Sequence, residues 1–463
     1  MKKRTLCIVI LISFYNYCQN NSENIEYKKR VLETIEINFL SSYYQQEGDN
    51  ASVTGGIGNE DLEDFHPNII ISIPLSDDNF ITIDYGISTY TSASSSNGNP
   101  FDAGSNYNET TSPWYASSGA SKVDTWRSLN LEYTHFSDDR NTIINANISN
   151  SKEWDYKSFG FGGGITKYSN NKNTSYSFAT QIYLDEWMPI YPKELDYYDI
   201  YDGDTNIGFF NSRKIFDETG SVSQDWTPIN NFSPMGDKNR DTYSLSFLFS
   251  QILNENSQIS FFIDFINQKG WLANPLQRVY FSDINNFYIG NPESIPIYTS
   301  NENRDVFHLA DDIERLPATR IKIPLGLRYN YFFSENITLR SYYRFYKDDW
   351  GVNSHTISLE LPIKFLENLT FYPSYRFYTQ VKSDYFEAYD QHLSSSIFYT
   401  SDYDLSSFRS NQFGFGLKYV DIFTKLKFWS FGLESFDLNY SHYSKNSNFK
   451  SQILSIGFKF IVD

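Results

Sequence analysis

Cysteine is almost absent from this sequence, and long apolar runs are missing altogether. Only two of the 463 residues are cysteines, Cys7 and Cys18, and both fall within the first eighteen positions. If that segment is removed, the chain has no thiol, which excludes disulfides, cysteine nucleophiles and thiolate metal sites. No stretch of about 18 apolar residues occurs, so no transmembrane helix is predicted.

Basic residues are also in deficit. The sequence has 38 Lys and Arg against 56 Asp and Glu, a formal net charge of −18. Nucleic-acid binding needs clustered cations on a net basic surface, so no nucleic-acid partner is expected. The six histidines form no His-Glu-x-x-His pair, and no Gly-x-Ser-x-Gly elbow exists. We therefore predict no enzyme activity.

What the sequence has in abundance is aromatic residues and alternation. It contains 37 Tyr and 39 Phe. From Thr319 to Gln380 every second residue is apolar or aromatic, and the residues between are polar and often basic. A period of two is that of a β-strand. A membrane-spanning barrel strand needs such a pattern over about ten residues, although a soluble sandwich shows the same alternation.

The lengths of the connections separate these two folds. About sixteen alternating segments are joined alternately by short turns rich in Asp, Asn and Ser and by connections that are often long. Seven turns and eight loops are what sixteen strands need when both chain ends lie on the turn side. We predict an all-β, transmembrane, antiparallel up-and-down β-barrel of about sixteen strands in a bacterial outer membrane. Loops 187–240 and 269–317 are long enough to fold into the lumen as a plug.

The ends of the chain fit an exported barrel. Residues 1–18 are predicted to be a signal peptide with cleavage after Cys18, and lipidation of Cys18 is the alternative. Residues 19–30 are a polar periplasmic tail, and residues 31–463 form a single barrel. The last strand alternates through Phe458 and Phe460. It looks like the signal that barrel assembly machinery reads, so that machinery and outer-membrane lipid are the expected partners.

The polar face of the alternating strands is the main candidate for function. If the apolar face meets lipid, seven cations from neighbouring strands point into the lumen: Arg320, Lys322, Arg328, Arg340, Arg344, Lys364 and Arg376. The carboxylates of the same phase are Glu36, Asp84, Glu132, Asp264 and Glu360. Rings of charge set pore selectivity, whereas buried charges must be paired. An anion-selective wall and a structural network of ion pairs are the two hypotheses.

Two further motifs carry weaker signals. Gly160 to Gly164 lies in a strand pattern and lacks the Lys-Ser/Thr of a phosphate loop, so we expect a bend or a ring packed over bare backbone there. Asp199, Asp202 and Asp204 partly resemble a calcium loop but lack the distal Glu. A solvated acidic loop is favoured, and we predict no metal and no cofactor.

Several segments together resemble a known family. They are Thr54–Gly58, Ser137–Ile143, Asp155–Gly164, Leu184–Pro192, Asn274–Phe281, Tyr346–Gly351 and Phe398–Leu405. With them the chain resembles a Bacteroidota-type outer-membrane β-barrel family known only as a domain of unknown function. The resemblance implies the barrel but no catalytic or ligand residues. Members look like neighbours of periplasmic redox and flavin-attachment proteins, an association only.

We therefore predict a porin-like channel or transporter for a small polar or anionic solute. The alternative is a non-conducting barrel scaffold whose loops bind an envelope protein complex, linked to periplasmic redox or flavin proteins.

Overall fold

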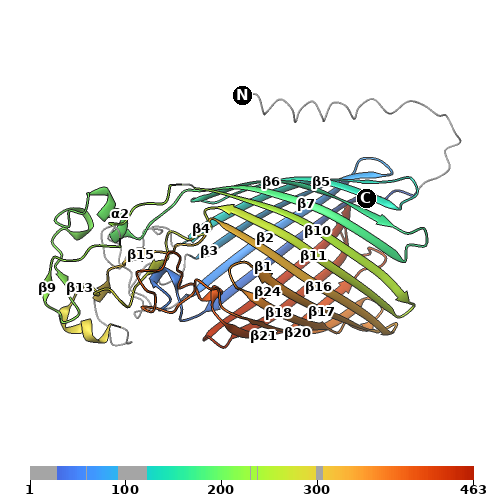
Figure 1. The fold of residues 1–463 in the computed structure, drawn as a ribbon. Coiled ribbons are helices and arrows are strands. Elements are labelled where there is room, and N and C mark those ends of the chain that lie inside the picture. The colour runs from blue at the N-terminus through green and yellow to red at the C-terminus, as the bar shows by residue number, and fades with distance from the viewer. Residues whose placement is uncertain are drawn as a thin grey trace, which may run out of the picture.

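The computed structural model describes residues 29–58, 60–91, 123–229, 231–236, 238–298 and 306–462. Their main element is an antiparallel sheet that closes on itself (Figure 1). The closure is made by β1 (Ile35–Glu47), which pairs with both β2 (Leu62–Pro74) and β24 (Phe449–Val462). The predicted signal peptide lies outside the described residues.

Sixteen strands form the wall in the part of the chain that the structure describes. Besides the three named above, they are β3 (Asn79–Thr91), β4 (Val123–Phe136), β5 (Thr142–Lys152), β6 (Tyr156–Tyr168), β7 (Thr174–Trp187), β10 (Asn239–Asn254), β11 (Ser257–Gly270), β16 (Thr319–Ser334), β17 (Ile337–Asp348), β18 (Asn353–Glu360) with its continuation β19 (Ile363–Leu366), β20 (Leu369–Gln380), β21 (Phe408–Val420) and β23 (Phe431–Lys445). The short β22 (Lys427–Phe428) belongs to a turn. The predicted barrel of about sixteen strands is confirmed.

Short turns and long loops lie at opposite ends of the barrel, as predicted (Figure 1). The turns are closed by their own polar side chains. In the turn between β4 and β5, the Ser137 hydroxyl accepts from the Thr142 amide at 2.9 Å and donates to Asp139 at 2.6 Å. The described chain begins at the turn end, where Arg30 forms an ion pair with Asp77 at 2.9 Å.

The long loops fold together into a second body, the cap, made of residues 188–238, 271–318 and 381–407 with the smaller loop 48–61. It contains helix α2 (Lys193–Ile200) and a sheet of four short strands, β9 (Val222–Ser223), β8 (Ile215–Phe216), β13 (Tyr288–Gly290) and β14 (Val306–His308). No helix in the described residues is long and apolar enough to cross a membrane. Figure 1 places these elements beyond the ends of the strands. Loops 187–240 and 269–317, which are long enough to fold into the lumen, instead pack against each other in the cap.

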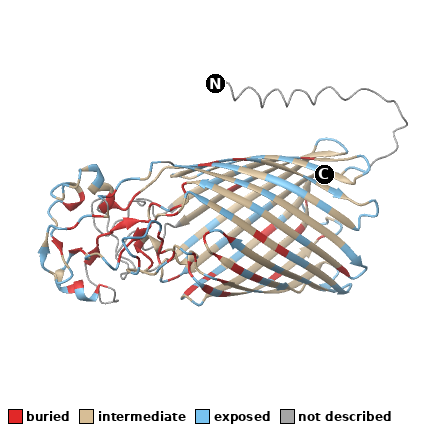
Figure 2. Ribbon diagram, in the orientation of Figure 1, coloured by how far each residue is buried: buried red, intermediate tan, exposed pale blue. Residues whose placement is uncertain are grey.

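The hydrophobic core lies in the cap and not in the barrel. Leu195, Phe209 and Ile313 are fully buried there, and Trp226 is 2% exposed. Figure 2 shows buried residues concentrated in the cap, while the wall is mostly intermediate. The barrel strands are instead held together by backbone hydrogen bonds, since each described strand of the wall pairs with a neighbour on both sides. The cap therefore has hydrophobic stabilisation of its own.

One face of the barrel wall is an apolar belt. The members of this belt are 38–51% exposed, and they include Phe39, Tyr85, Leu129, Ile148, Phe178, Leu245, Phe265, Leu327 and Ile357. Soluble monomers rarely expose so large a continuous apolar surface. Such a belt matches the lipid face of a membrane barrel.

Candidate functional site: the charged lumen wall

The strand register places the seven predicted cations on one face of the sheet. Arg328 pairs with Tyr342, Gly326 with Arg344, and Asn330 with Arg340. Arg376 follows through its pairing with Ser358, and Lys364 through its pairing with Thr370. Because paired residues on neighbouring strands point to the same side, these cations share one wall.

That face is the inside of the barrel. The rings of Phe262 on β11 and Tyr342 on β17 stack with centroids 6.0 Å apart and planes 9° apart, although β16 lies between them. Strands two places apart are separated by about 9.5 Å, so the rings lean together over Gly326. A Cβ at Gly326 would come within 2.0 Å of the Phe262 ring. Side chains converge in this way on the concave face of a curved sheet.

The same packing explains the glycine-rich segment of β6. A Cβ added at Gly160 would meet the Tyr183 ring at 2.8 Å, and one at Gly162 would meet the Gln181 side chain. Both partners lie on β7 in register with these glycines. The predicted packing of a ring over bare backbone is confirmed.

Two of the seven cations belong to structural ion pairs. The guanidinium of Arg320 donates to Asp348 at 2.9 Å and lies 4.3 Å from the Trp350 ring. Arg340 pairs with Glu360 at 2.7 Å across β17 and β18. For these two arginines the structural hypothesis holds.

The other five cations have no carboxylate within ion-pair distance among the described residues: Lys322, Arg328, Arg344, Lys364 and Arg376. Arg328 rests 5.7 Å from the centroids of both Phe262 and Tyr342, and Arg344 lies 5.7 Å from that of Tyr346. A ring face orients a guanidinium without neutralising its charge. A cavity of about 460 Å³ adjoins Arg328, which lines it with Asn330, Arg340, Tyr342, Ser358 and Glu360. Arg328 is therefore accessible to a solute in this cavity.

The opposite arc of the lumen is acidic. Asp84 accepts from Asn68 at 2.7 Å, and Glu132 accepts from Asn145 at 3.2 Å, so hydrogen bonds hold both carboxylates without cancelling their charge. Glu36 on β1 is paired with Lys459 at 3.1 Å, and Asp264 lies on β11, directly beside β16 and its cations. Strands β3 and β4 lie about halfway round the barrel from β16 to β20, whereas β1 lies four strands from β20. The carboxylates of β3 and β4 therefore face the cations of β16 to β20 across the lumen.

Sequence reasoning missed a further lumen carboxylate, Asp437 on β23, two strands from β20. Asp437 accepts from Lys418 at 3.4 Å and from the Tyr372 hydroxyl at 3.3 Å. With His66, Asp84 and Asn439 it lines a lumen cavity of about 570 Å³. The signal was present, because Asp437 alternates with Phe436 and Leu438, but the strand was not read for charge.

Beyond the lumen, the cap buries a set of ionisable groups. Arg278 and Glu194 form an ion pair at 2.6 Å with side chains 3% and 0% exposed. Burial, with the nearby Asp402 carboxylate, raises the pKa of Glu314 to about 8. Burial also raises the pKa of Asp311 to about 7. None of these residues was singled out from the sequence, because loops carry no periodicity that marks burial.

His308 is the most enclosed histidine of the cap. Its ring is sandwiched between Tyr280 at 4.1 Å and Tyr288 at 4.7 Å, and its Nδ1 lies 2.5 Å from the Tyr389 hydroxyl. Burial lowers the pKa of His308 to about 3. A neutral imidazole packed among tyrosines serves the cap core.

The weak calcium candidate is not supported by the geometry. Asp199 lies in the last turn of helix α2, while Asp204 accepts from the amide of Asn206 at 2.9 Å and so caps its own turn. That hydrogen bond lowers the pKa of Asp204. The described residues contain no group of three or more His, Cys, Asp or Glu side chains arranged to hold a metal ion.

Comparison with known proteins places the chain in a family. The model of the family described as "Protein of unknown function (DUF3570)" matches residues 66–456. The chain belongs to this family. The predicted resemblance to a family without assigned activity is confirmed. Among curated proteins, none matches the sequence of this DUF3570 member.

Solved structures similar to this DUF3570 barrel are distant. A bacterial polysaccharide outer membrane secretin is 8% identical, covering 93% of this chain and 98% of its own, with a TM-score of 0.41. A deltaS2 mutant of the TodX monoaromatic hydrocarbon channel is 7% identical, covering 94% and 91%, with a TM-score of 0.39. Pseudomonas aeruginosa OpdQ is 7% identical, covering 93% and 98%, with a TM-score of 0.38.

Proposed function

We propose that this DUF3570 barrel is an outer-membrane channel for small anionic solutes. The observation that carries the proposal is the row of lumen cations that have no carboxylate partner. Sixteen strands leave a lumen wide enough for water. These cations, of which Arg328 and Arg344 rest on aromatic rings, face the carboxylates of β3 and β4 and set up a transverse field that favours anions along the basic wall.

The apolar belt supports placement in a bilayer, with outer-membrane lipid around the barrel and the assembly machinery as a partner during biogenesis. The turn end, where the described chain begins and ends, then faces the periplasm, and the cap faces outward. Solutes enter past the cap, which is joined to the rim. Lys445 on β23 pairs with Asp404 of the cap at 2.6 Å.

Planar bilayer recordings under a salt gradient test the proposal. We expect stepwise conductance and a reversal potential on the anion-selective side. The triple variant Arg328→Gln, Arg344→Gln, Arg376→Gln should lower the anion-to-cation permeability ratio several-fold, because it removes three unpaired charges. The shift should shrink at about 1 M salt, where the Debye length is only about 3 Å.

A matched control is the double variant Arg340→Gln, Glu360→Gln. It removes a paired cation and its carboxylate from the same wall, so the net charge of the lumen is unchanged. The reversal potential should stay at the wild-type value. Absence of conductance at every voltage, or an equal shift in the control, would contradict the channel.

A second candidate function has an observation of its own. The cap has a hydrophobic core that lies beyond the ends of the barrel strands. This supports the scaffold hypothesis, in which the cap holds an envelope protein complex and the barrel is only an anchor. Pull-down in mild detergent should then recover a partner in fixed proportion, and recovery of the barrel alone would count against it.

A further inference from the structure

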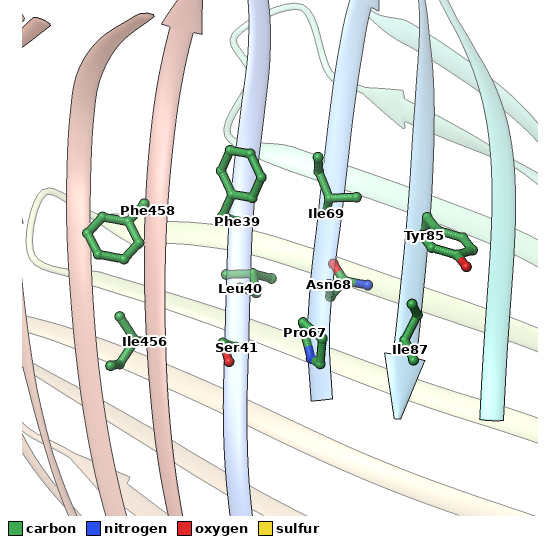
Figure 3. A pocket seen from close by; sticks show the side chains of 10 residues that line it. All are labelled: Phe39, Leu40, Ser41, Pro67, Asn68, Ile69, Tyr85, Ile87, Ile456 and Phe458. Atoms are coloured by element: carbon green, nitrogen blue, oxygen red, sulfur yellow. The ribbon is translucent and has the colours of Figure 1, made fainter. Parts of the chain in front are cut away.

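The apolar belt has a hollow on strands β24, β1, β2 and β3, and we propose that it binds one acyl chain of a membrane lipid. The proposal rests on the placement of the barrel in a bilayer. The hollow encloses about 490 Å³. Figure 3 shows its lining side chains on four adjacent strands.

The hollow arises because small residues stand between large ones. The row at one end consists of Phe458, Phe39, Ile69 and Tyr85, which are in register across the four strands. In the next row Ser41 of β1 is in register with Pro67 of β2 and with Ile456 of β24. Ser41 and Pro67 form the floor, since neither side chain reaches as far from the sheet as its neighbours (Figure 3).

Large side chains also stand beyond the other end of the hollow, outside its lining. The third row contains Tyr43, which is in register with Leu454 of β24 and Phe65 of β2. These side chains are 40%, 41% and 52% exposed, so they stand out from the wall. Large residues at both ends turn a flat patch into a bounded slot.

The wall beneath the slot is thin. The pairing of β2 with β3 runs from Pro74 to Asn68 and resumes only at Phe65, so it lapses at His66 and Pro67. Proline has no amide hydrogen to give to the ladder. Behind the same place lies the 570 Å³ lumen cavity, and Leu40 and Asn68 line both hollows. Little protein is therefore available to fill the slot from behind.

Continuity with the lipid-facing belt identifies the occupant. Every large side chain around the slot is apolar or aromatic, so a charged or strongly polar ligand would lose its hydration without compensation. In a bilayer the slot faces hydrocarbon, and a void there forfeits dispersion contacts on its whole lining. An acyl chain lying in the slot restores these contacts. Because lipid tails are already in hydrocarbon, the gain comes from packing and not from the hydrophobic effect.

Photocrosslinking in vesicles tests the proposal. The full-length protein is reconstituted with a phosphatidylethanolamine carrying a diazirine in its acyl chain, irradiated, and digested for peptide mapping. We expect adducts to concentrate on slot residues such as Ile69, Tyr85 and Ile456. Ser41→Phe fills the floor and should lower their yield roughly tenfold, which corresponds to about 1.4 kcal/mol. Pro67→Phe is a second filling variant.

Thr180→Phe is the matched control. Thr180 is an exposed residue of β7 that is in register with Leu245 in the belt, far from the slot. Its adduct pattern should equal that of the wild type, and gel mobility before and after heating confirms that each variant is folded.

Three outcomes overturn the proposal in distinguishable ways. If adducts are spread evenly around the belt and Ser41→Phe does not change them, the slot is not a lipid-binding site. The placement of the barrel in a membrane then still stands. If no strand carries an adduct, the barrel does not lie in the bilayer, and the proposed function is contradicted as well. Loss of an oligomer on Ser41→Phe, measured by light scattering, identifies a second copy of the chain as the occupant.

Discussion

Arg278→Ala should destabilise the cap by about 3–5 kcal/mol, the cost of leaving a buried partner charge unpaired. The carboxylate of Glu194 is fully buried, and Arg278 holds both of its oxygens, at 2.6 Å and 3.1 Å. The same guanidinium donates to Val53, so the variant also releases loop 48–61 from the cap. Limited proteolysis in detergent should show rapid cleavage within 188–238 and 271–318, while the barrel remains folded.

The control for this variant replaces the whole pair. Arg278→Met with Glu194→Leu leaves no buried charge, and such apolar replacements of buried pairs are often neutral or stabilising. We expect near wild-type protection from protease. If Arg278→Ala alone leaves the cleavage rate unchanged, the pair does not hold the cap.

The Glu314 contribution to cap stability should be lost as the pH rises to about 8, whereas the buried neutral His308 acts in the opposite sense and loses its contribution as the pH falls from 6.5 to about 3. The folded-state pKa of Glu314 is raised from 4.5 to about 8, so between these values the folded cap holds a proton that the unfolded segment has lost. The stabilisation from Glu314 is fully present below its pKa in the unfolded chain. It is lost as the pH rises through its pKa in the folded cap. Asp311 and Glu60, both raised to about 7 mainly by burial, act in the same direction.

Glu314→Gln should remove the part of this pH dependence that Glu314 contributes, while Asp311 and Glu60 keep theirs. The amide keeps an acceptor for the Asn274 backbone N–H, which Glu314 binds at 2.5 Å, and a donor toward the Thr400 hydroxyl. At pH 9 the free energy of unfolding of the variant cap should exceed that of the wild type by on the order of 4 kcal/mol. Each unit of pKa shift corresponds to about 1.36 kcal/mol.

The measurement is the rate of cap proteolysis between pH 5 and pH 9, with a protease active throughout. The matched control is Glu293→Gln, which neutralises an exposed carboxylate of the cap. Its pH profile should follow that of the wild type. Identical profiles for Glu314→Gln and the wild type would show that Glu314 is not the group that titrates.

The lumen wall shows which features of the site the alternation of residues in a strand can predict. Arg328 and Arg344 were placed inside the barrel from alternation alone, and the register agrees. Their surroundings were not predictable. The ring of Phe262 lies 66 residues before Arg328 in the chain, and it reaches that arginine only because Gly326 leaves room for it on the intervening strand.

The candidate plug shows the opposite limit. Tyr191, Trp226 and Trp271 come from the two long loops and join one buried cluster, against which Trp187 packs. That cluster lies outside the lumen, and its buried pair joins Glu194 to Arg278, 84 residues apart. A loop without periodicity gives no local sign of what it will pack against.

The sequence by itself determined the strand number, the turn end and the loop end, and the inward phase of each predicted lumen charge. It could do so because alternation and turn chemistry are local, and a closed barrel leaves only an apolar and a polar face. The tertiary structure decided where the long loops go, which lumen cations are neutralised, and where the belt is hollow. These depend on side chains from distant strands and loops, such as Asp348 beside Arg320 and Pro67 beside Ser41, whose meeting no local pattern encodes.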